Sequence, residues 1–287
     1  MAHRNMASMR VAAVPLLLSL ATVPAAAQPA TDVHLSYDTY AAGLEVMQMH
    51  AFFGLGPWNY HIDLDYHTTG LVGLLYRGHQ TNTVRGNWDD GHADPLEFFG
   101  DGSWRGQQRR TLISYDRGIP QIKDLQPPQE TEREPVPADL QRHTMDTLSA
   151  LAQLMRKVEQ TGTCETAVRT YDGRRLLDIA AHTSGPEQLD PTGRSIFSGK
   201  ALRCDFEGHE IAGFLLGQDD PEHRQPLHGS AWLAPMAGAS PLPVRIAFQT
   251  RWFGWATMYL TEATRNPAHA ETTSQDPSGT FPRKAQN

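Results

Sequence analysis

The amino-acid sequence predicts a mainly β fold of the α+β class, with a curved antiparallel sheet or open half-barrel and one amphipathic helix packed against its concave side. Three observations lead to this prediction. Strand-length apolar segments are separated by Gly, Pro, Asn and Asp along most of the chain. One segment near the middle has helical periodicity. Crossover helices do not separate the strand segments, and parallel strands need such crossovers, so we expect an antiparallel sheet.

The start of the chain is typical of a secretory signal peptide. Arg4 and Arg10 lead into an apolar run at 11–23, and Ala25–Ala27 then resembles an A-x-A cleavage site. The apolar run is shorter than the roughly 20 residues that a membrane-spanning helix needs. We therefore expect residues 1–27 to be a cleaved signal peptide. The mature protein is then expected to be periplasmic and to have no stable membrane span.

The composition of the chain argues against several classes of function. The chain has 287 residues, a formal net charge of -7 and two cysteines. A mild acidic balance argues against nucleic-acid binding, and two cysteines are too few for a zinc–cysteine site or an iron–sulfur cluster. In an oxidising compartment we expect Cys164 and Cys204 to form a disulfide. The loop of about 40 residues would contribute roughly 4 kcal/mol in the chain-entropy model.

Residues 33–125 are predicted to form short strands. The clearest alternation lies within 58–69, where apolar and polar side chains occupy opposite faces, as in a half-buried antiparallel strand. The apolar face has Tyr60, Ile62, Leu64 and Tyr66, and the polar face has His61, Asp63, Asp65 and His67. Further strands are predicted at 44–53, 78–87, 96–99, 107–115 and 121–125.

The middle of the chain contains the predicted helix. An acidic, proline-rich stretch at 127–137 should form an extended loop joining the two halves. Apolar residues then repeat at three- and four-residue steps over 146–160, with Thr144 or Asp146 as N-cap and Gly162 ending the helix. An amphipathic helix normally buries its apolar stripe against its own sheet.

The second half returns to strands, predicted at 164–171, 176–182, 199–206, 210–216, 231–236, 243–250 and 255–262. Asp172-Gly173 is a hairpin signal, which favours a turn with solvated arginines at 174 and 175 over a basic loop that holds an anion. Residues after 262 are almost without aliphatic side chains. We therefore expect a single domain at 32–262 and a disordered tail at 263–287.

The polar face of the 58–69 strand is the candidate for chemistry. His61, Asp63, Asp65 and His67 project to one side, with alternate residues roughly 6.6–7 Å apart. With a third ligand from another strand, they would suit a metal-dependent or acid/base hydrolase. The plainer interpretation is a solvated outer face. G-x-S-x-G and S-x-x-K motifs are missing, so the sequence predicts no catalytic residue and no cofactor.

Two aromatic or aliphatic segments are candidates for ligand contact. Residues 70–76 (GLVGLLY) form either the lip of a ligand cavity or a short buried turn. Residues 251–255 (RWFGW) form either an exposed patch or rings that cap the core. The candidate ligand-binding residues are Leu71, Leu74, Tyr76, Trp252, Phe253 and Trp255.

An ordered set of short motifs resembles a known family. The motifs are Leu35–Tyr40 with Gly43-Leu44, Thr69–Leu74, Trp104–Gly106, Tyr115-Asp116, Asp146–Leu151, Tyr171–Arg175 and Pro243–Arg245. In this order they resemble the bacterial exported domain of unknown function 3108, over about residues 32–262. The resemblance implies a β-rich envelope protein and assigns no catalytic residues.

The combined observations favour a non-enzymatic periplasmic protein that binds an apolar or amphipathic, lipid-like envelope molecule or assists envelope assembly. The expected architecture is similar to periplasmic lipoprotein carriers, which hold acyl chains between sheet and helix, an analogy of fold alone. The alternatives are the hydrolase described above and a structural protein that binds a partner through its aromatic patch. The sequence makes no prediction of an oligomeric state.

Overall fold

The computed structural model describes residues 31–217, 225–236, 240–250 and 254–266. The predicted signal peptide and the predicted tail after residue 266 lie outside these ranges. The strands are β1 (Thr31–Ala41), β2 (Leu44–Leu55), β3 (Asn59–Thr68), β4 (Gly78–Asp89), β5 (His92–Trp104), β6 (Gln107–Asp116), β7 (Ile119–Gln126), β8 (Thr166–Tyr171), β9 (Leu176–Leu189), β10 (Gly199–Ala212), β11 (Leu227–Pro235), β12 (Pro241–Thr250) and β13 (Gly254–Asn266). The helices are α1 (Gly70–Leu75), the short 3-10 helix η1 (Gln129–Thr131) and α2 (Thr147–Thr161).

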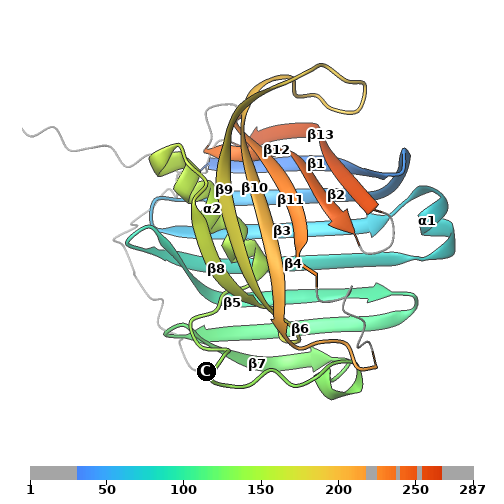
Figure 1. The fold of residues 1–287 in the computed structure, drawn as a ribbon, viewed down its shortest axis with the longest axis vertical. Coiled ribbons are helices and arrows are strands. Elements are labelled where there is room, and N and C mark those ends of the chain that lie inside the picture. Colours follow the sequence, from blue (N-terminus) through green and yellow to red (C-terminus); the bar gives the residue numbers. More distant parts are fainter. Residues whose placement is uncertain (1–30, 218–224, 237–239, 251–253, 267–287) are drawn as a thin grey trace, which may run out of the picture.

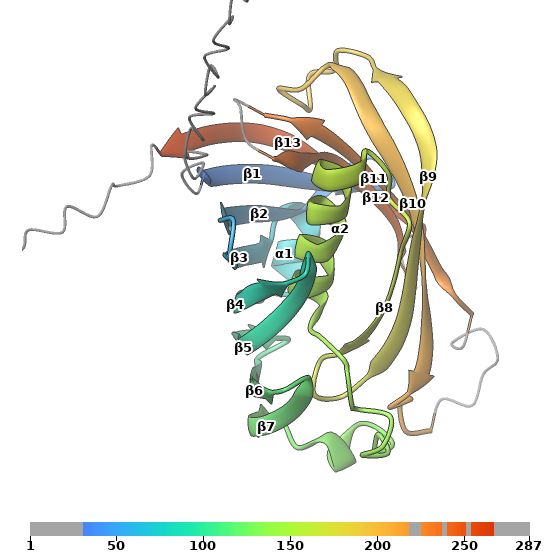
Figure 2. The same cartoon turned by 90° about the vertical axis from the view of Figure 1, so that its left-hand side faces the viewer.

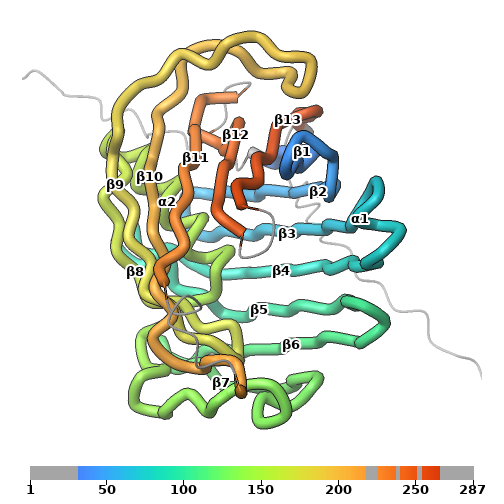
Figure 3. Tube along the Cα trace, turned by 45° about the vertical axis from the view of Figure 1, so that its right-hand side comes forward, coloured from blue at the N-terminus to red at the C-terminus, as the bar shows by residue number. Residues whose placement is uncertain are grey.

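The thirteen described strands form one curved antiparallel sheet in the order β7-β6-β5-β4-β3-β2-β1-β13-β12-β11-β10-β9-β8 (Figure 1). Neighbours in space are also neighbours in sequence, except where β1 pairs with β13. We call β1–β7 wing 1 and β8–β13 wing 2. The wings meet at the β1–β13 pair (Figure 3), and the sheet stays open between its edge strands β7 and β8. The predicted mainly β half-barrel is therefore confirmed.

Helix α2 lies between the two wings on the concave side of the sheet (Figure 2). Its N-cap is Asp146, whose Oδ1 accepts a hydrogen bond from Ser149 N (2.9 Å). It ends at Gly162, which has a left-handed φ of 69° that a glycine adopts without strain. The helix predicted at 146–160 is thus confirmed to within one residue at each end.

Several predicted strand boundaries are wrong, because β9, β10 and β13 are each longer than the strands predicted there. The strands predicted at 199–206 and 210–216 are the single strand β10, in which Gly208 pairs with Ile179 of β9 and Leu227 of β11. β9 continues to Leu189, beyond its predicted end at residue 182, and β13 continues to Asn266, beyond its predicted end at residue 262. The segment at 70–75 forms helix α1. The sequence predicted either the lip of a ligand cavity or a short buried turn there, and in neither case a helix. Polar strand extensions lack the apolar alternation from which strands are recognised.

The main core fills the space between α2 and both wings. Among its fully buried members are Leu35, Ile62, Val84, Met155 and Leu260, which come from both wings and the helix. The contact with wing 1 is partly polar. Tyr60 OH of β3 donates to Ser149 Oγ of α2 (2.8 Å), and Gln153 Nε2 donates to Gly91 O (3.1 Å).

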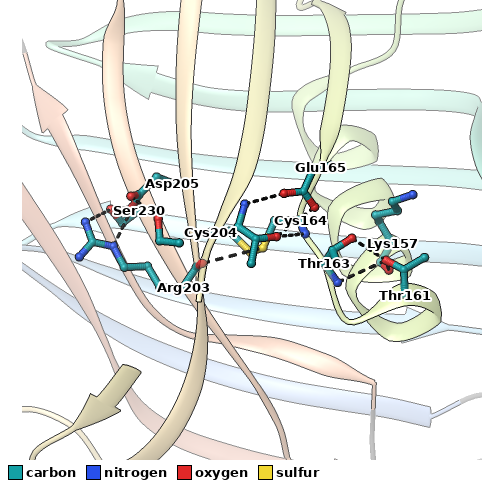
Figure 4. The surroundings of a disulfide bond; sticks show 11 residues. Lys157, Thr161, Thr163, Cys164, Glu165, Arg203, Cys204, Asp205 and Ser230 are labelled. Carbon is teal, nitrogen blue, oxygen red and sulfur yellow. Dashed lines mark hydrogen bonds and ion pairs between the residues drawn. A yellow bond between two sulfur atoms is a disulfide. The ribbon is translucent and has the colours of Figure 1, made fainter. Parts of the chain in front are cut away.

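A disulfide joins the segment after α2 to wing 2 (Figure 4). Cys164 and Cys204 are bonded with an S–S distance of 1.99 Å, at the pairing predicted from the sequence. Both side chains are fully buried, and Cys164 N donates to Thr183 Oγ1 of β9 (2.8 Å). The bond therefore links the C-terminal end of α2 to β10, in the middle of wing 2.

The open side of the sheet is bridged by polar contacts. Arg174, in the β8–β9 turn, reaches wing 1, where its guanidinium donates to Thr111 Oγ1 (3.1 Å) and to Pro127 O (2.8 Å). Met145 N donates to Arg169 O, and Tyr171 N donates to Met145 O, so the linker before α2 also follows the edge of β8. Asp172-Gly173 is the expected turn, but Arg174 is buried rather than solvated.

Candidate functional site

An apolar cleft lies between α2 and the inner face of wing 2. Its volume is about 210 Å³. The helix contributes one side and five strands of wing 2, β8 to β12, contribute the other, and none of the lining residues is charged. The cleft is lined by Thr147, Leu148, Ala150, Leu151, Leu154, Thr166, Val168, Ile179, Ala181, Phe206, Ala231 and Ile246.

The two sides of α2 explain why the space opens toward wing 2. Ser149, Ala152 and Gln153 are buried toward wing 1, where small or hydrogen-bonded side chains let the helix approach closely. On wing 2 the inward positions opposite the helix include Ala181 and Ala231, whose side chains are too short to fill the gap. The cleft thus follows from small residues at inward-facing strand positions.

Phe206 of β10 bounds the cleft and is held in place by a glycine. A Cβ on Gly229 of β11 would lie 2.2 Å from Phe206 Cζ, so the ring occupies space that only glycine leaves free. Further apolar side chains of both wings, among them Met49, Leu64 and Phe248, are only partly buried, although they pack against the core. Apolar surface of the sheet is therefore accessible outside the cleft as well.

One residue that lines the cleft has a buried polar atom without a hydrogen-bond partner among the described residues. This atom is Thr166 Oγ1. A buried hydroxyl without a partner costs roughly 1–3 kcal/mol, so such atoms in native structures call for an explanation. Because Thr166 Oγ1 is enclosed by protein, a ligand in the cleft reaches it only after the Thr166 side chain rotates.

The predicted polar face of β3 lies on the convex side of the sheet. Tyr60 contacts α2, so the alternate residues, beginning with His61, point away from the core. His61 Nε2 and Asp63 Oδ1 are 3.0 Å apart, with side chains 35% and 43% exposed. Asp65 is exposed and accepts a hydrogen bond from Thr81 Oγ1 of β4 (3.0 Å).

These residues do not converge with a further ligand. Within the described ranges, no three His, Cys, Asp or Glu side chains are placed to hold one metal ion, and this includes His61, Asp63, Asp65 and His67. Thr83 Oγ1 instead donates to Asp63 (2.7 Å), as expected for an outer strand face paired through polar neighbours. The hydrolase alternative therefore has no support from the described residues.

The predicted ligand-contact residues lie apart from the cleft. Leu71, Leu74 and Tyr76 are exposed on or next to α1, in the β3–β4 connection. Trp255 is half-exposed at the start of β13. Trp252 and Phe253 lie outside the described residues. None of the four described residues lines the apolar cleft, and their role in binding stays a prediction.

A buried polar group at the N-terminal end of α2 was predicted only in part. Asp146 was a candidate cap, but it is also fully buried, and burial raises its pKa to about 6 despite the hydrogen bonds from Ser149. Ser149 Oγ donates to Asp146 Oδ2 (2.6 Å) and accepts from Tyr60 OH. Nearby, Tyr115 OH is buried without a hydrogen-bond partner among the described residues.

The sequence analysis did not predict that residues of wing 2 line a cleft. Alanines at inward positions of apolar strands were a signal that could have indicated it.

The comparison with known families agrees with this fold. The model of a family described as a protein of unknown function, DUF3108, matches residues 35–261. The chain belongs to the DUF3108 family. This confirms the family resemblance found in the sequence motifs. No curated protein sequence matches this DUF3108 chain.

Among solved structures, the DUF3108 chain is similar to a β-barrel-like protein of the domain of unknown function DUF1849 from Brucella abortus. The TM-score is 0.51 at 11% sequence identity, and the match covers 84% of this chain and 100% of the other. At this identity the likeness concerns the fold alone. Among the described residues of the DUF3108 chain, no helix is long and apolar enough to cross a membrane.

Proposed function

We propose that this DUF3108 protein is an exported, non-enzymatic carrier that binds one hydrocarbon chain of an apolar or amphipathic envelope molecule between α2 and wing 2. The uncharged cleft is the observation that supports this function most strongly. The buried disulfide supports the exported location, because such bonds persist in oxidising compartments. The signal-peptide features of residues 1–27 support it independently.

The volume of the cleft limits the size of the ligand that it can hold. An apolar cavity of about 150 Å³ stays dry and binds a ligand as small as benzene, whereas pockets for larger ligands span roughly 300–1,000 Å³. A cleft of about 210 Å³ therefore suits one chain segment or one ring rather than a bulky ligand. The partly buried apolar side chains outside the cleft would contact the remainder of the molecule.

Thr166 favours a ligand that carries a carbonyl group over a pure hydrocarbon. After rotation of its side chain toward the cleft, the buried and unpartnered hydroxyl could donate to an ester or amide carbonyl placed next to a hydrocarbon chain. A pure alkane would leave this hydroxyl unsatisfied, whereas an acylated molecule would not. The proposed ligand is therefore an acyl compound, and Thr166 would position its carbonyl.

Filling the cleft should weaken binding strongly. Ala181 lines the cleft, whereas Ala180 on the same strand faces the opposite side of the sheet. We expect Ala181→Leu to lower the affinity for a fluorescent fatty acid by about tenfold or more, because the added carbons occupy the ligand's space. Binding is measured by fluorescence titration, with thermal unfolding as a check that each variant folds.

Ala180→Leu is the matched control, since it adds the same atoms to the convex side. We expect it to bind the probe like the wild type. If Ala181→Leu and the wild type bind equally well, or if the folded wild type does not bind the probe, the carrier function is refuted.

A further inference from the structure

Three leucines on helix α1 lie outside the packed core. Leu71, Leu74 and Leu75 are 62%, 75% and 76% exposed, and Tyr76 after them is exposed as well. None of the residues of α1 is buried. A single exposed leucine is ordinary, but a contiguous exposed cluster marks a contact surface. We call these four residues the leucine tip.

The backbone holds the leucine tip outward. Thr69 N donates to Val46 O of β2 (3.0 Å), and Gly73 N donates to Thr69 O (2.8 Å). Gly70 has a left-handed φ of 56°, and a Cβ there would lie 2.6 Å from Glu45 O. The start of α1 is therefore packed by its backbone against β2, and the leucines are directed away from the core.

The tip lies at one end of the sheet. Figures 1 and 3 both show α1 at the extremity of wing 1, beyond the turns of neighbouring strands. Two more exposed apolar side chains belong to this end. Leu44 begins β2 and Trp255 lies at the start of β13, and these two strands flank β1. The exposed apolar surface thus continues along the sheet end.

Two arginines lie next to the leucine tip, although the chain as a whole is acidic with a net charge of -7. Arg77 directly follows Tyr76 and is exposed. The Arg105 guanidinium lies 4.5 Å from the centre of the Tyr76 ring, and Arg105 N donates to Arg77 O (3.1 Å). The acid beside the tip, Glu45, accepts a hydrogen bond from Thr69 Oγ1 (3.0 Å).

We propose that the leucine tip docks on the surface of an anionic phospholipid bilayer. The leucines would enter the boundary between headgroups and acyl chains, and Arg77 and Arg105 would meet the lipid phosphates. Apolar side chains flanked by arginines match this layered surface, in which an anionic layer covers a hydrocarbon one. A projecting tip also suits insertion better than a flat protein contact. The inference does not depend on a ligand in the cleft.

Vesicle flotation tests the docking surface. The full exported protein is mixed with vesicles of phosphatidylglycerol and phosphatidylethanolamine, or of phosphatidylcholine alone. We expect the wild type to float with the anionic vesicles. Leu71→Ser/Leu74→Ser/Leu75→Ser should lower the bound fraction about tenfold or more, because the inserted apolar area is lost. Arg77→Gln/Arg105→Gln should remove the preference for anionic vesicles and its dependence on salt.

Trp58 provides the matched control. It is 78% exposed and directly precedes β3, whereas α1 follows β3, so the two sites lie at opposite ends of one strand. Trp58→Ser should float like the wild type. If Trp58→Ser loses binding as strongly as the leucine variant, the tip is not the docking surface. A wild type that floats with neither vesicle overturns the proposal and points to a protein partner for the tip.

Discussion

At the scale of single residues, Asp146 combines two properties that usually exclude each other. It caps α2 through Ser149, which is a role for an exposed polar residue, and it is fully buried. Burial disfavours the carboxylate, and the hydrogen bonds from Ser149 offset this effect only in part, so the pKa rises to about 6. The charge on this cap therefore changes as the pH passes through about 6.

This raised pKa predicts how stability depends on pH. An unfolded aspartate has a pKa of about 3.9, so between that value and about 6 the folded state binds the extra proton. The contribution of Asp146 to the unfolding free energy is full below pH 4 and is lost as the pH rises through 6, by about 3 kcal/mol. Asp146→Asn keeps an oxygen acceptor and cannot ionise, so it should remove this part of the slope.

Urea unfolding between pH 4 and pH 7.5 measures the effect. The unfolding free energy of the wild type minus that of Asp146→Asn should decrease as the pH rises. Other carboxylates contribute equally to both proteins and cancel in this difference. Parallel curves for the two proteins would show that the pKa of Asp146 is ordinary.

The sequence predicted that Thr144 or Asp146 would cap the helix, because cap residues are recognised from local pattern alone. It did not predict the burial of Asp146 or the hydrogen bond between Tyr60 and Ser149. Those depend on the register between β3 and a helix almost ninety residues later, which local pattern does not determine. Cys164 and Cys204 could be paired because the chain has only two cysteines.

At the scale of elements, the contact between wing 1 and α2 depends on a glycine in β4. A Cβ on Gly86 would lie 2.3 Å from Tyr60 Cζ, so the tyrosine ring occupies the space above this glycine. Gly86→Ala should displace Tyr60 and break its hydrogen bond to Ser149. We expect a loss of about 2–3 kcal/mol in unfolding free energy, from overpacking and from the lost buried hydrogen bond.

Chemical denaturation of Gly86→Ala and Gly193→Ala checks this prediction. A Cβ on Gly193 meets no heavy atom within 4 Å, so the control should unfold like the wild type to within about 0.5 kcal/mol. Equal midpoints for both variants would mean that Tyr60 does not depend on Gly86.

The strand boundaries show where sequence patterns stop being informative. β3 was recognised because its inner face is apolar and its outer face polar. Residues 183–188 of β9, by contrast, are Thr, Ser, Gly, Pro, Glu and Gln, so this part resembled a loop although it pairs with β10. Gly208 of β10 fell between two predicted strands, although the pairing of β10 with β9 continues past it to Ala212.

At the scale of the whole molecule, the sequence indicated a curved antiparallel sheet or open half-barrel with one packed amphipathic helix, and the structure confirms it. The pairing of β1 with β13 could not be predicted, because it joins strands at opposite ends of the chain. The same holds for Arg174, whose hydrogen bonds to Thr111 and Pro127 cross the open side between the wings. Contacts at such sequence separations create the concave space in which α2 and the cleft lie.

Native mass spectrometry of the protein purified from the periplasm, without detergent, tests most directly whether the cleft holds an acyl ligand. We expect a chain that begins at Gln28 with one bound molecule of lipid mass, which organic extraction removes. Ala181→Leu should lack this adduct and Ala180→Leu should retain it. A folded wild type found only at the mass of the bare chain, with no lipid in the extract, would contradict the carrier function.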